Sequence, residues 1–336
     1  MMASASESIK LPRIGFLGTG RIGIRRMQSL LESGLVEAVA VADPSPEMVH
    51  AALELAPLAT AVDGLDGLLA ENLDGIVIAT PSALHAAQSI AAFEAGLAVF
   101  CQKPLGRTEE EVAAVVEAAR RADRLLGVDL SYRHTTAMTR IRELIRGGDL
   151  GSIFGIDLVF HNAYGPDKPW FFKKELSGGG CVMDLGVHMV DLALWALDFP
   201  TVVSATGHLF SQGQPIARDS DTVEDYATAT MTLETGTVVR LTCSWHLHAG
   251  RDAVIEADFY GTEGGASLKN LEGSFFDFAA WHHTRTASRQ VAEPDAIWPG
   301  GATLGWARSL AASSHFEATA ENFTKVSAVL DQIYAR

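Results

Sequence analysis

Lysine and arginine are missing from a long part of this chain: none occurs from Met27 to Gln102. Over all 336 residues, 41 acidic side chains outnumber 26 Lys and Arg, and the net charge is −15. Nucleic acids and anionic membranes are bound through clustered cations, so this charge argues against both as partners. The first cation after Arg26 is Lys103, which stands before Pro104 and is therefore restricted to an extended backbone.

Cysteine is equally scarce. Cys101, Cys181 and Cys243 are odd in number and far apart, so they form neither a disulfide framework nor the spacing of a zinc site. We therefore expect a reducing, cytoplasmic location. Residues 1–12 are polar and Ser-rich, without the apolar core of a secretory signal. No uninterrupted apolar stretch approaches the ~20 residues of a membrane span.

The residues that are present favour a large core, because 48% are hydrophobic and 20% charged, and the length suggests about two domains. Short apolar runs alternate with Ala-, Leu- and Glu-rich stretches through the first 130 residues. This alternation predicts an α/β fold with a parallel sheet covered on both faces. Strands are expected at 13–17, 36–42, 75–79, 98–101 and 126–130, and helices at 21–33, 45–55, 82–95 and 108–122. Thr108 and Glu111 are typical of a capping box at the start of the last helix.

The first strand is followed by a glycine-rich turn that opens a helix, Gly18-Thr19-Gly20-Arg21-Ile22-Gly23. In this context Gly18 allows a tight turn, Gly20 lets the backbone approach a pyrophosphate, and Gly23 lets helix and strand pack closely. The helix N-terminus then faces the phosphates. The turn therefore predicts a dinucleotide site.

Asp43 lies at the end of the second expected strand, where a carboxylate can accept both hydroxyls of an adenosine ribose. The same carboxylate would repel a 2′-phosphate, and the stretch without cations offers nothing to neutralise one. NAD is therefore favoured over NADP, although Arg21 could still reach a phosphate. The alternative for Asp43 is a turn-forming residue before Pro44.

Thr80 and Pro81 follow the strand expected at 75–79, at the edge where ligands bind in such sheets. We expect them to border the nicotinamide half of the cofactor. His85, one turn into the next helix, is either part of this site or a helix histidine that is exposed or has its hydrogen bonds satisfied by the protein.

The second half contains a helix with an unusual set of ionisable residues after three glycines. Asp184, His188 and Asp191 share one face by their spacing, while almost all other positions are apolar. Charges on a buried helix are costly unless paired or functional, so the set predicts a site. Two alternatives remain: a carboxylate that merely orients a core histidine, and a divalent metal site.

Later segments are β-rich. Strands are expected at 226–233, 237–245, 253–260 and 265–270, and a closing helix at 318–335. Their alternation predicts a largely antiparallel sheet with one covered face.

Together these motifs resemble the Gfo/Idh/MocA family of glucose–fructose oxidoreductase and inositol dehydrogenase. The resemblance covers nearly the whole chain and rests on the glycine turn, Ala79-Thr80-Pro81 with His85, Gln102-Lys103-Pro104 and Asp184-x-Gly186-x-His188-x-x-Asp191. It implies a Rossmann domain at 1–130 and an α+β domain with an open sheet at 131–336. The helix at 318–336 is expected to pack back onto the first domain, and the open sheet would mediate a homodimer or homotetramer.

The resemblance also implies that Lys103, Asp184 and His188 are catalytic and that a sugar or polyol lies between the sheet and nicotinamide. His188 would take the hydroxyl proton, Asp184 would orient His188, and Lys103 would bond the reacting oxygen; Lys103 as proton acceptor is the second assignment. The family usually has Glu at position 102, where this chain has Gln102. No metal is required.

Other residues near the two motifs are candidates for contact with the ligands. We expect Gln102, Lys103 and Trp170 beside the cofactor. The substrate candidates are Tyr132, Arg133, Asn162, Tyr164, Lys168 and Trp170, with Trp245, His246 and His248 as further possibilities.

Two other functions fit the same resemblance. One is an NAD-dependent glycoside hydrolase, and the other is a non-catalytic NAD-binding sensor or partner protein.

Overall fold

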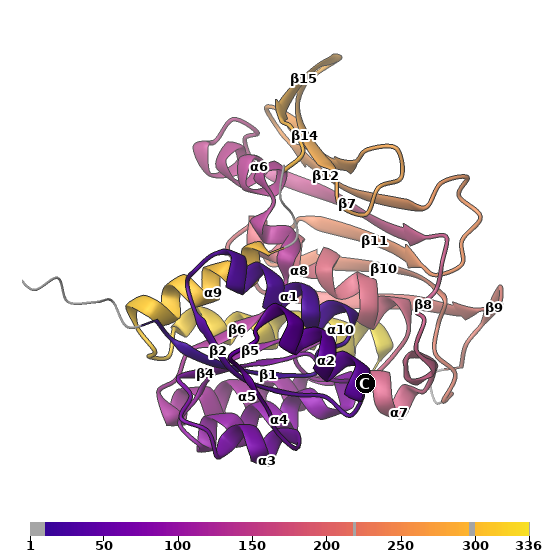
Figure 1. The fold of residues 1–336 in the computed structure, drawn as a ribbon. Helices are drawn as coiled ribbons and strands as arrows, with labels where there is room; N and C mark the ends of the chain where they lie inside the picture. The colour runs from indigo at the N-terminus through magenta and orange to yellow at the C-terminus, as the bar shows by residue number, and fades with distance from the viewer. Residues whose placement is uncertain (1–10, 218–219, 296–299, 336) are drawn as a thin grey trace, which may run out of the picture.

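The computed structural model describes residues 11–217, 220–295 and 300–335, which form two sheets with helices between and around them (Figure 1). The first sheet has six parallel strands in the order β3-β2-β1-β4-β5-β6. Its strands are β1 (Arg13–Leu17), β2 (Glu37–Ala42), β3 (Thr60–Ala61), β4 (Gly75–Ile78), β5 (Ala98–Cys101) and β6 (Leu126–Val128). The predicted parallel sheet is confirmed.

Helices cover both faces of this sheet because successive strand residues point to opposite sides. In β5, Ala98 and Phe100 join the core beneath one helical layer, whereas Val99 and Cys101 join the core beneath the other. The first layer comprises α1 (Arg21–Glu32), α2 (Pro46–Leu55) and α9 (Gly301–Ala312), and the second α3 (Gly64–Leu69), α4 (Ser82–Glu94) and α5 (Glu109–Ala122).

The predicted elements of the first half all occur, within a few residues at their ends. Two short elements, β3 and α3, were not predicted. At the start of α5 the Thr108 hydroxyl accepts the N–H of Glu111, as expected for a helix cap, while the Glu111 carboxylate accepts the N–H of Arg107.

The second sheet has nine strands in the order β15-β14-β13-β12-β7-β11-β10-β8-β9. Among the described strands of this sheet, only β7 and β11 are parallel neighbours, and the other pairs are antiparallel. The strands are β7 (Ile153–Asn162), β8 (Val202–Ser211), β9 (Gln214–Pro215), β10 (Tyr226–Leu233), β11 (Val238–Ser244), β12 (Ala253–Gly261), β13 (Gly265–Asn270), β14 (Phe278–Thr284) and β15 (Ala287–Ala292). The four predicted strands are confirmed, and β7, β8, β9, β14 and β15 were missed.

One face of the second sheet packs against helices, and alternation along the strands explains why. Ile156, Leu158 and Phe160 of β7 are buried under that layer, whereas β11 exposes Arg240 toward the other side. The helices of the second half are α6 (Thr136–Gly147), α7 (Lys174–Ser177), the π-helix η3 (Val182–Gly186), α8 (Val187–Ala196) and α10 (Asn322–Tyr334), with 3₁₀ turns η1 (Ser131–His134), η2 (Pro169–Phe172) and η4 (Ala318–Glu321).

The end of the chain touches both sheets. Helix α9, which was not predicted, packs on β5, β6 and α1, with the Trp306 ring 5.7 Å from that of Phe100. Helix α10 contacts α5 on one side and β8 and α8 on the other. The predicted boundary between residues 130 and 131 stays a prediction.

One helical run, Lys174–Ala196, is long and apolar enough to cross a membrane, as judged by length and composition among the described residues. However, 89% of its apolar window is buried inside the structure, as in the core helix of a soluble protein.

A buried carboxylate holds the part of this helical run that directly precedes Asp184. Glu224 accepts the N–H groups of Gly180 and Val182 and the hydroxyl of Tyr334 at 2.7 Å, and the Tyr334 oxygen accepts the N–H of Met183 at 3.1 Å. Burial raises the pKa of Glu224, which these hydrogen bonds oppose. The last helix is thereby tied to the segment that carries Asp184.

Tyr334→Phe should lower the free energy of unfolding by about 1–3 kcal/mol, because a buried carboxylate oxygen and a backbone N–H lose a partner. Urea unfolding measures this effect. Tyr260→Phe is the matched control, since Tyr260 bonds Asp157 at 3.3 Å on the surface. Equal losses in the two variants would contradict the role of the Tyr334 hydroxyl.

Candidate active site

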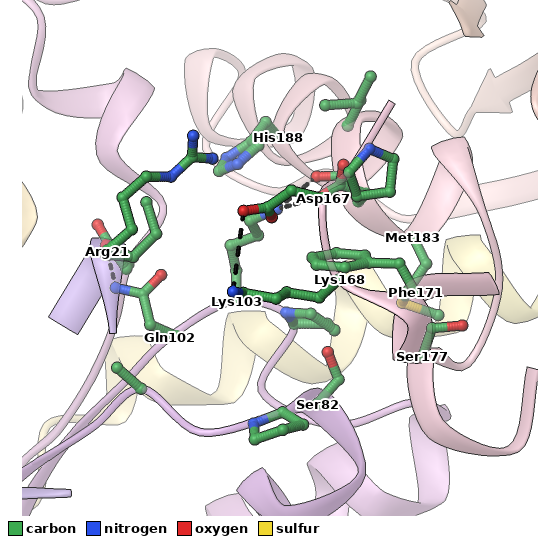
Figure 2. A pocket seen from close by; sticks show the side chains of 18 of the residues that line it. Arg21, Ser82, Gln102, Lys103, Asp167, Lys168, Phe171, Ser177, Met183 and His188 are labelled. Atoms are coloured by element: carbon green, nitrogen blue, oxygen red, sulfur yellow. Dashed lines mark hydrogen bonds and ion pairs between the residues drawn. The ribbon is translucent and has the colours of Figure 1, made fainter. Parts of the chain in front are cut away.

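A cavity of about 700 Å³ lies where the carboxyl ends of the parallel strands meet the second sheet. Figure 2 shows Gln102, Lys103 and His188 around it, together with Asp167 and Lys168. Most of the predicted site residues line it: Gly20, Arg21, Ile22, Thr80, Pro81, His85, Gln102, Lys103, Tyr132, Asn162, Tyr164, Lys168, Trp170, Asp184 and His188.

The glycine turn has the geometry that its spacing predicted. Gly18 has a φ of +84°, and a Cβ on Gly23 would lie 2.0 Å from the Gly18 carbonyl oxygen. A Cβ on Gly20 would meet nothing within 4 Å, so this backbone faces open space at the cavity. The N–H of Thr19 donates to Asp43 Oδ2 at 2.7 Å, which fixes the turn to the end of β2. Thr19 Oγ1 is buried without a partner.

His85 ties two loops together at the sheet edge. Its Nδ1 lies 2.7 Å from the Pro104 carbonyl oxygen and its Nε2 lies 2.7 Å from that of Thr80. Burial lowers the pKa of His85, and a neutral imidazole can donate to only one of these oxygens. The histidine therefore holds the loops that carry Thr80 and Lys103, while one edge of it lines the cavity.

Lys103 is paired with Asp184 across the cavity. Its Nζ donates to Asp184 Oδ1 and to the Asp184 carbonyl oxygen, each at 2.6 Å. Trp245 Nε1 donates to the other carboxylate oxygen at 3.1 Å. An ammonium group has three protons, so this arrangement leaves one for a ligand.

The helix that carries Asp184 differs from the regular helix that the spacing predicted. Residues Val182–Gly186 form a π-helix, and the α-helix begins at Val187. Such π-helical turns are frequent at functional sites. Asp184 contacts Lys103 and Trp245, so the expectation that it orients His188 is not met by any contact among the described residues.

Asp191 is paired with an arginine and makes no described contact with Asp184 or His188. Both of its carboxylate oxygens accept hydrogen bonds from the Arg133 guanidinium, which also lies over Phe199 and Phe323. Burial raises the pKa of Asp191, and the charge of Arg133 opposes this shift. Arg133 is not among the residues that line the cavity, and its predicted contact with substrate stays a prediction.

No group of three or more His, Cys, Asp or Glu side chains in the described ranges is placed to hold a metal ion. The side chains of Asp184, His188 and Asp191 therefore do not point to one common position, as ligands of a divalent metal would.

His188 is buried at the cavity wall, with its ring centroid 4.8 Å from that of Tyr132. Its Nδ1 has no hydrogen-bond partner. Burial, with the charges of Lys103 and Arg26, holds the pKa of His188 well below its usual value. The imidazole is therefore neutral at pH 7.

Several lining residues were not anticipated. Arg26, Asp129 and Ser131 form a buried polar cluster with Gln102. Asp129 directly follows β6, so its place after a strand was a signal that could have revealed it. Phe160, Asp167, Phe171 and Phe276 also line the cavity.

The remaining candidates lie outside the cavity lining. Trp245 donates to Asp184 from outside the cavity lining, whereas His246 and His248 lie beyond the end of β11. Asp43 and Gly18 belong to the nucleotide turn beside the cavity.

The free energy of unfolding should fall as the pH drops below about 6.5, because unfolding lets His188 bind a proton that the folded state excludes. His188→Gln should reduce this loss by up to about 1.4 kcal/mol between pH 7.5 and 5.5, because only the one pH unit below 6.5 contributes to it. Urea titrations at pH 7.5 and 5.5 measure it. His50→Gln, at a 78% exposed side chain, is the control; an equal reduction there would contradict the assignment.

A nucleotide turn and a set of ionisable side chains thus share one cavity, which is the arrangement of a nucleotide-dependent oxidoreductase. Residues 12–130 match the model of the oxidoreductase family with an NAD-binding Rossmann fold, and residues 138–267 match that of the GFO/IDH/MocA C-terminal domain. The chain belongs to the Gfo/Idh/MocA family of oxidoreductases, as the sequence resemblance predicted.

D-glucoside 3-dehydrogenase of Escherichia coli (strain K12) is 30% identical to this chain, over 80% of this chain and 79% of its own length. GenD2 from gentamicin A biosynthesis, solved in complex with NAD, has a TM-score of 0.82 at 21% identity, over 100% of this chain and 96% of its own. Levoglucosan dehydrogenase in complex with NADH and levoglucosan also has a TM-score of 0.82 at 21% identity, over 97% of each chain. These comparisons give no support to a glycoside hydrolase.

Proposed function

We propose that this enzyme transfers a hydride between NAD and a secondary alcohol or hemiacetal carbon of a sugar, an inositol or a related polyol. The observation that carries the proposal is that the Lys103–Asp184 pair and His188 line the same cavity as the glycine turn. The names of the relatives, a glucoside dehydrogenase and a levoglucosan dehydrogenase, support a carbohydrate substrate.

The nucleotide turn fits NAD. Gly20 faces open space at the N-terminus of α1, where helix N–H groups attract phosphates. Thr19 Oγ1 is a buried polar atom without a protein partner beside it. Asp43, at the end of β2, is placed to accept ribose hydroxyls. When bound, NAD supplies the acceptor for the hydride; the protein supplies the proton chemistry.

Proton removal is assigned to His188. Its Nδ1 is buried in the wall, which leaves Nε2 as the nitrogen available to a substrate hydroxyl. The neutral imidazole can accept a proton at pH 7 because its pKa is lowered. Lys103, with one proton not donated to Asp184, hydrogen-bonds the same oxygen as negative charge develops. Lys103 as proton acceptor remains the second assignment.

The substrate side of the cavity is lined by aromatic and polar groups. Tyr164, Trp170 and Phe171 line the cavity together with Asn162 and Lys168. Aromatic faces pack against the C–H faces of a sugar ring, and the polar groups can bond its hydroxyls.

Absorbance of the reduced nicotinamide should rise when NAD⁺ is mixed with a substrate from a panel of aldoses, glucosides, anhydrosugars, inositols and other polyols. Absence of NADH formation with every member, at saturating NAD⁺ and over the pH range 6–10, would overturn the proposal. Sugar release without NADH formation would instead favour a hydrolase.

Lys103→Met and His188→Ala should each lower kcat by roughly 10²–10⁴-fold, the usual contribution of a positioned acid or base. NAD binding, followed by fluorescence titration, should change much less. Lys173→Met, at an exposed lysine near the cavity, is the control. Full turnover in either site variant would remove that residue from the mechanism.

Asp43→Ala should weaken NAD binding and narrow its lead over NADP, because the carboxylate both accepts ribose hydroxyls and repels a 2′-phosphate. The dissociation constants for the two nucleotides measure the change. Asp43 also accepts the N–H groups of Thr19 and Ser45, so Asp43→Asn, which keeps an acceptor oxygen, separates charge from turn geometry. An unchanged ratio of the NAD and NADP dissociation constants in both variants would contradict the assignment of Asp43.

A further inference from the structure

Four polar side chains form a buried cluster in the wall of the cavity. Arg26 comes from α1, Gln102 from the end of β5, Asp129 from the end of β6 and Ser131 from the 3₁₀ turn that follows. None is more than 9% exposed, yet all four line the cavity. Gln102 stands directly before Lys103, and Figure 2 shows both side chains at the same wall.

The cluster is organised around a single carboxylate. Asp129 Oδ2 accepts Nε of Arg26 and Nε2 of Gln102, and Oδ1 accepts the hydroxyl of Ser131. Strands β5 and β6 are parallel neighbours, and the N–H of Asp129 donates to the Cys101 carbonyl oxygen at 3.0 Å. Residues 102 and 129 are therefore held side by side by the sheet itself.

This geometry bears on the departure from the family pattern at position 102. A glutamate there would be an acceptor only, and it would face the Asp129 carboxylate at the place where Gln102 now donates. Two carboxylates this close in a buried site cannot both ionise readily, so one would have to hold a proton. Glutamine removes that conflict by presenting an N–H to Asp129.

We propose that Asp129 supplies, from the next strand, the carboxylate that the family pattern places at position 102. Gln102 and Asp129 form an exchanged pair in which one negative charge balances Arg26. Asp129 is a positioning residue: it fixes the Gln102 amide and thereby the backbone that presents Lys103. The inference that Gln102 and Asp129 have exchanged roles depends only on the contacts described above. The effect of this pair on turnover depends, in addition, on the proposed function.

The charge balance has a consequence for His188. Arg26 and Lys103 are the two cations whose charges lower the pKa of His188. Asp129 is in contact with one of them, so the wall beside the histidine carries a paired rather than an isolated guanidinium. Removing only the Asp129 charge would leave this cation less compensated next to the proposed base.

The test is a set of four proteins: wild type, Gln102→Glu, Asp129→Asn and the double variant. Gln102→Glu should lower kcat/KM by at least about tenfold and the melting temperature of the NAD-free protein by several degrees at pH 8. The double variant restores one carboxylate and one amide, so it should recover most of both losses. Gln28→Glu is the matched control, since Gln28 also donates to a carboxylate, that of Glu32, but on the surface.

The pH dependence of stability gives a second readout. In the folded Gln102→Glu variant, Asp129 would raise the pKa of the added carboxyl above its value in the unfolded chain, about 4.3. The loss in free energy of unfolding is therefore small near pH 4.3 and grows as the pH rises. The loss of stability of Gln102→Glu relative to wild type should therefore be smaller at pH 5 than at pH 8, and it should disappear in the double variant.

Three results would decide against the proposal. Gln102→Glu with wild-type stability at pH 8 would overturn the exchanged pair, and so would a double variant no better than the worse single one. Restored stability with turnover still lost would overturn the positioning of Lys103. If wild type oxidises no substrate, the proposed function fails, while the melting temperatures still decide the pair.

Discussion

The ion pair between Lys103 and Asp184 is the contact on which the cavity depends. It joins the end of β5 in the parallel sheet to the π-helix that packs on the second sheet. Both groups are partly buried, so each must be satisfied by good geometry, and the Asp184 carbonyl and Trp245 provide it. The pair therefore holds the two halves of the site at one distance and points an ammonium group at the ligand space.

The other buried charges follow the same rule. Asp191 is bonded by Arg133, Asp129 by three donors, and Glu224 by backbone amides and Tyr334. Each carboxylate also ties together segments distant in the chain, so the cost of burying charge is offset while the surroundings of the cavity are fixed. His188 is different, because its Nδ1 is buried without a partner. The rule that buried polar atoms are hydrogen-bonded is therefore broken at the residue to which we assign proton transfer.

Much of the fold was predictable from local pattern, and the misses have physical causes. The strands and helices of the first half are long enough to show their period, whereas β3 and α3 are too short. In the second half, β7 lies between β11 and β12, which come far later in the chain. Helix α9 is defined by packing, with Trp306 filling the space above Gly127. Such contacts are not encoded in a window of neighbouring residues.

The sequence alone determined the nucleotide turn and the strand ends that border the cavity, because each follows from residue type at a fixed spacing. The resemblance to the family, and not spacing, singled out Lys103, Asp184 and His188 as one set. Only the tertiary structure decided which charged side chains form ion pairs with one another. Lys103 and Asp184 are 81 positions apart and Arg133 and Asp191 are 58 apart. Helical spacing predicts a shared face only while the helix is regular, and the π-helix breaks that regularity between Asp184 and His188. The hydrogen bond from Gln102 to Asp129 likewise depends on the sheet, which places the ends of β5 and β6 side by side.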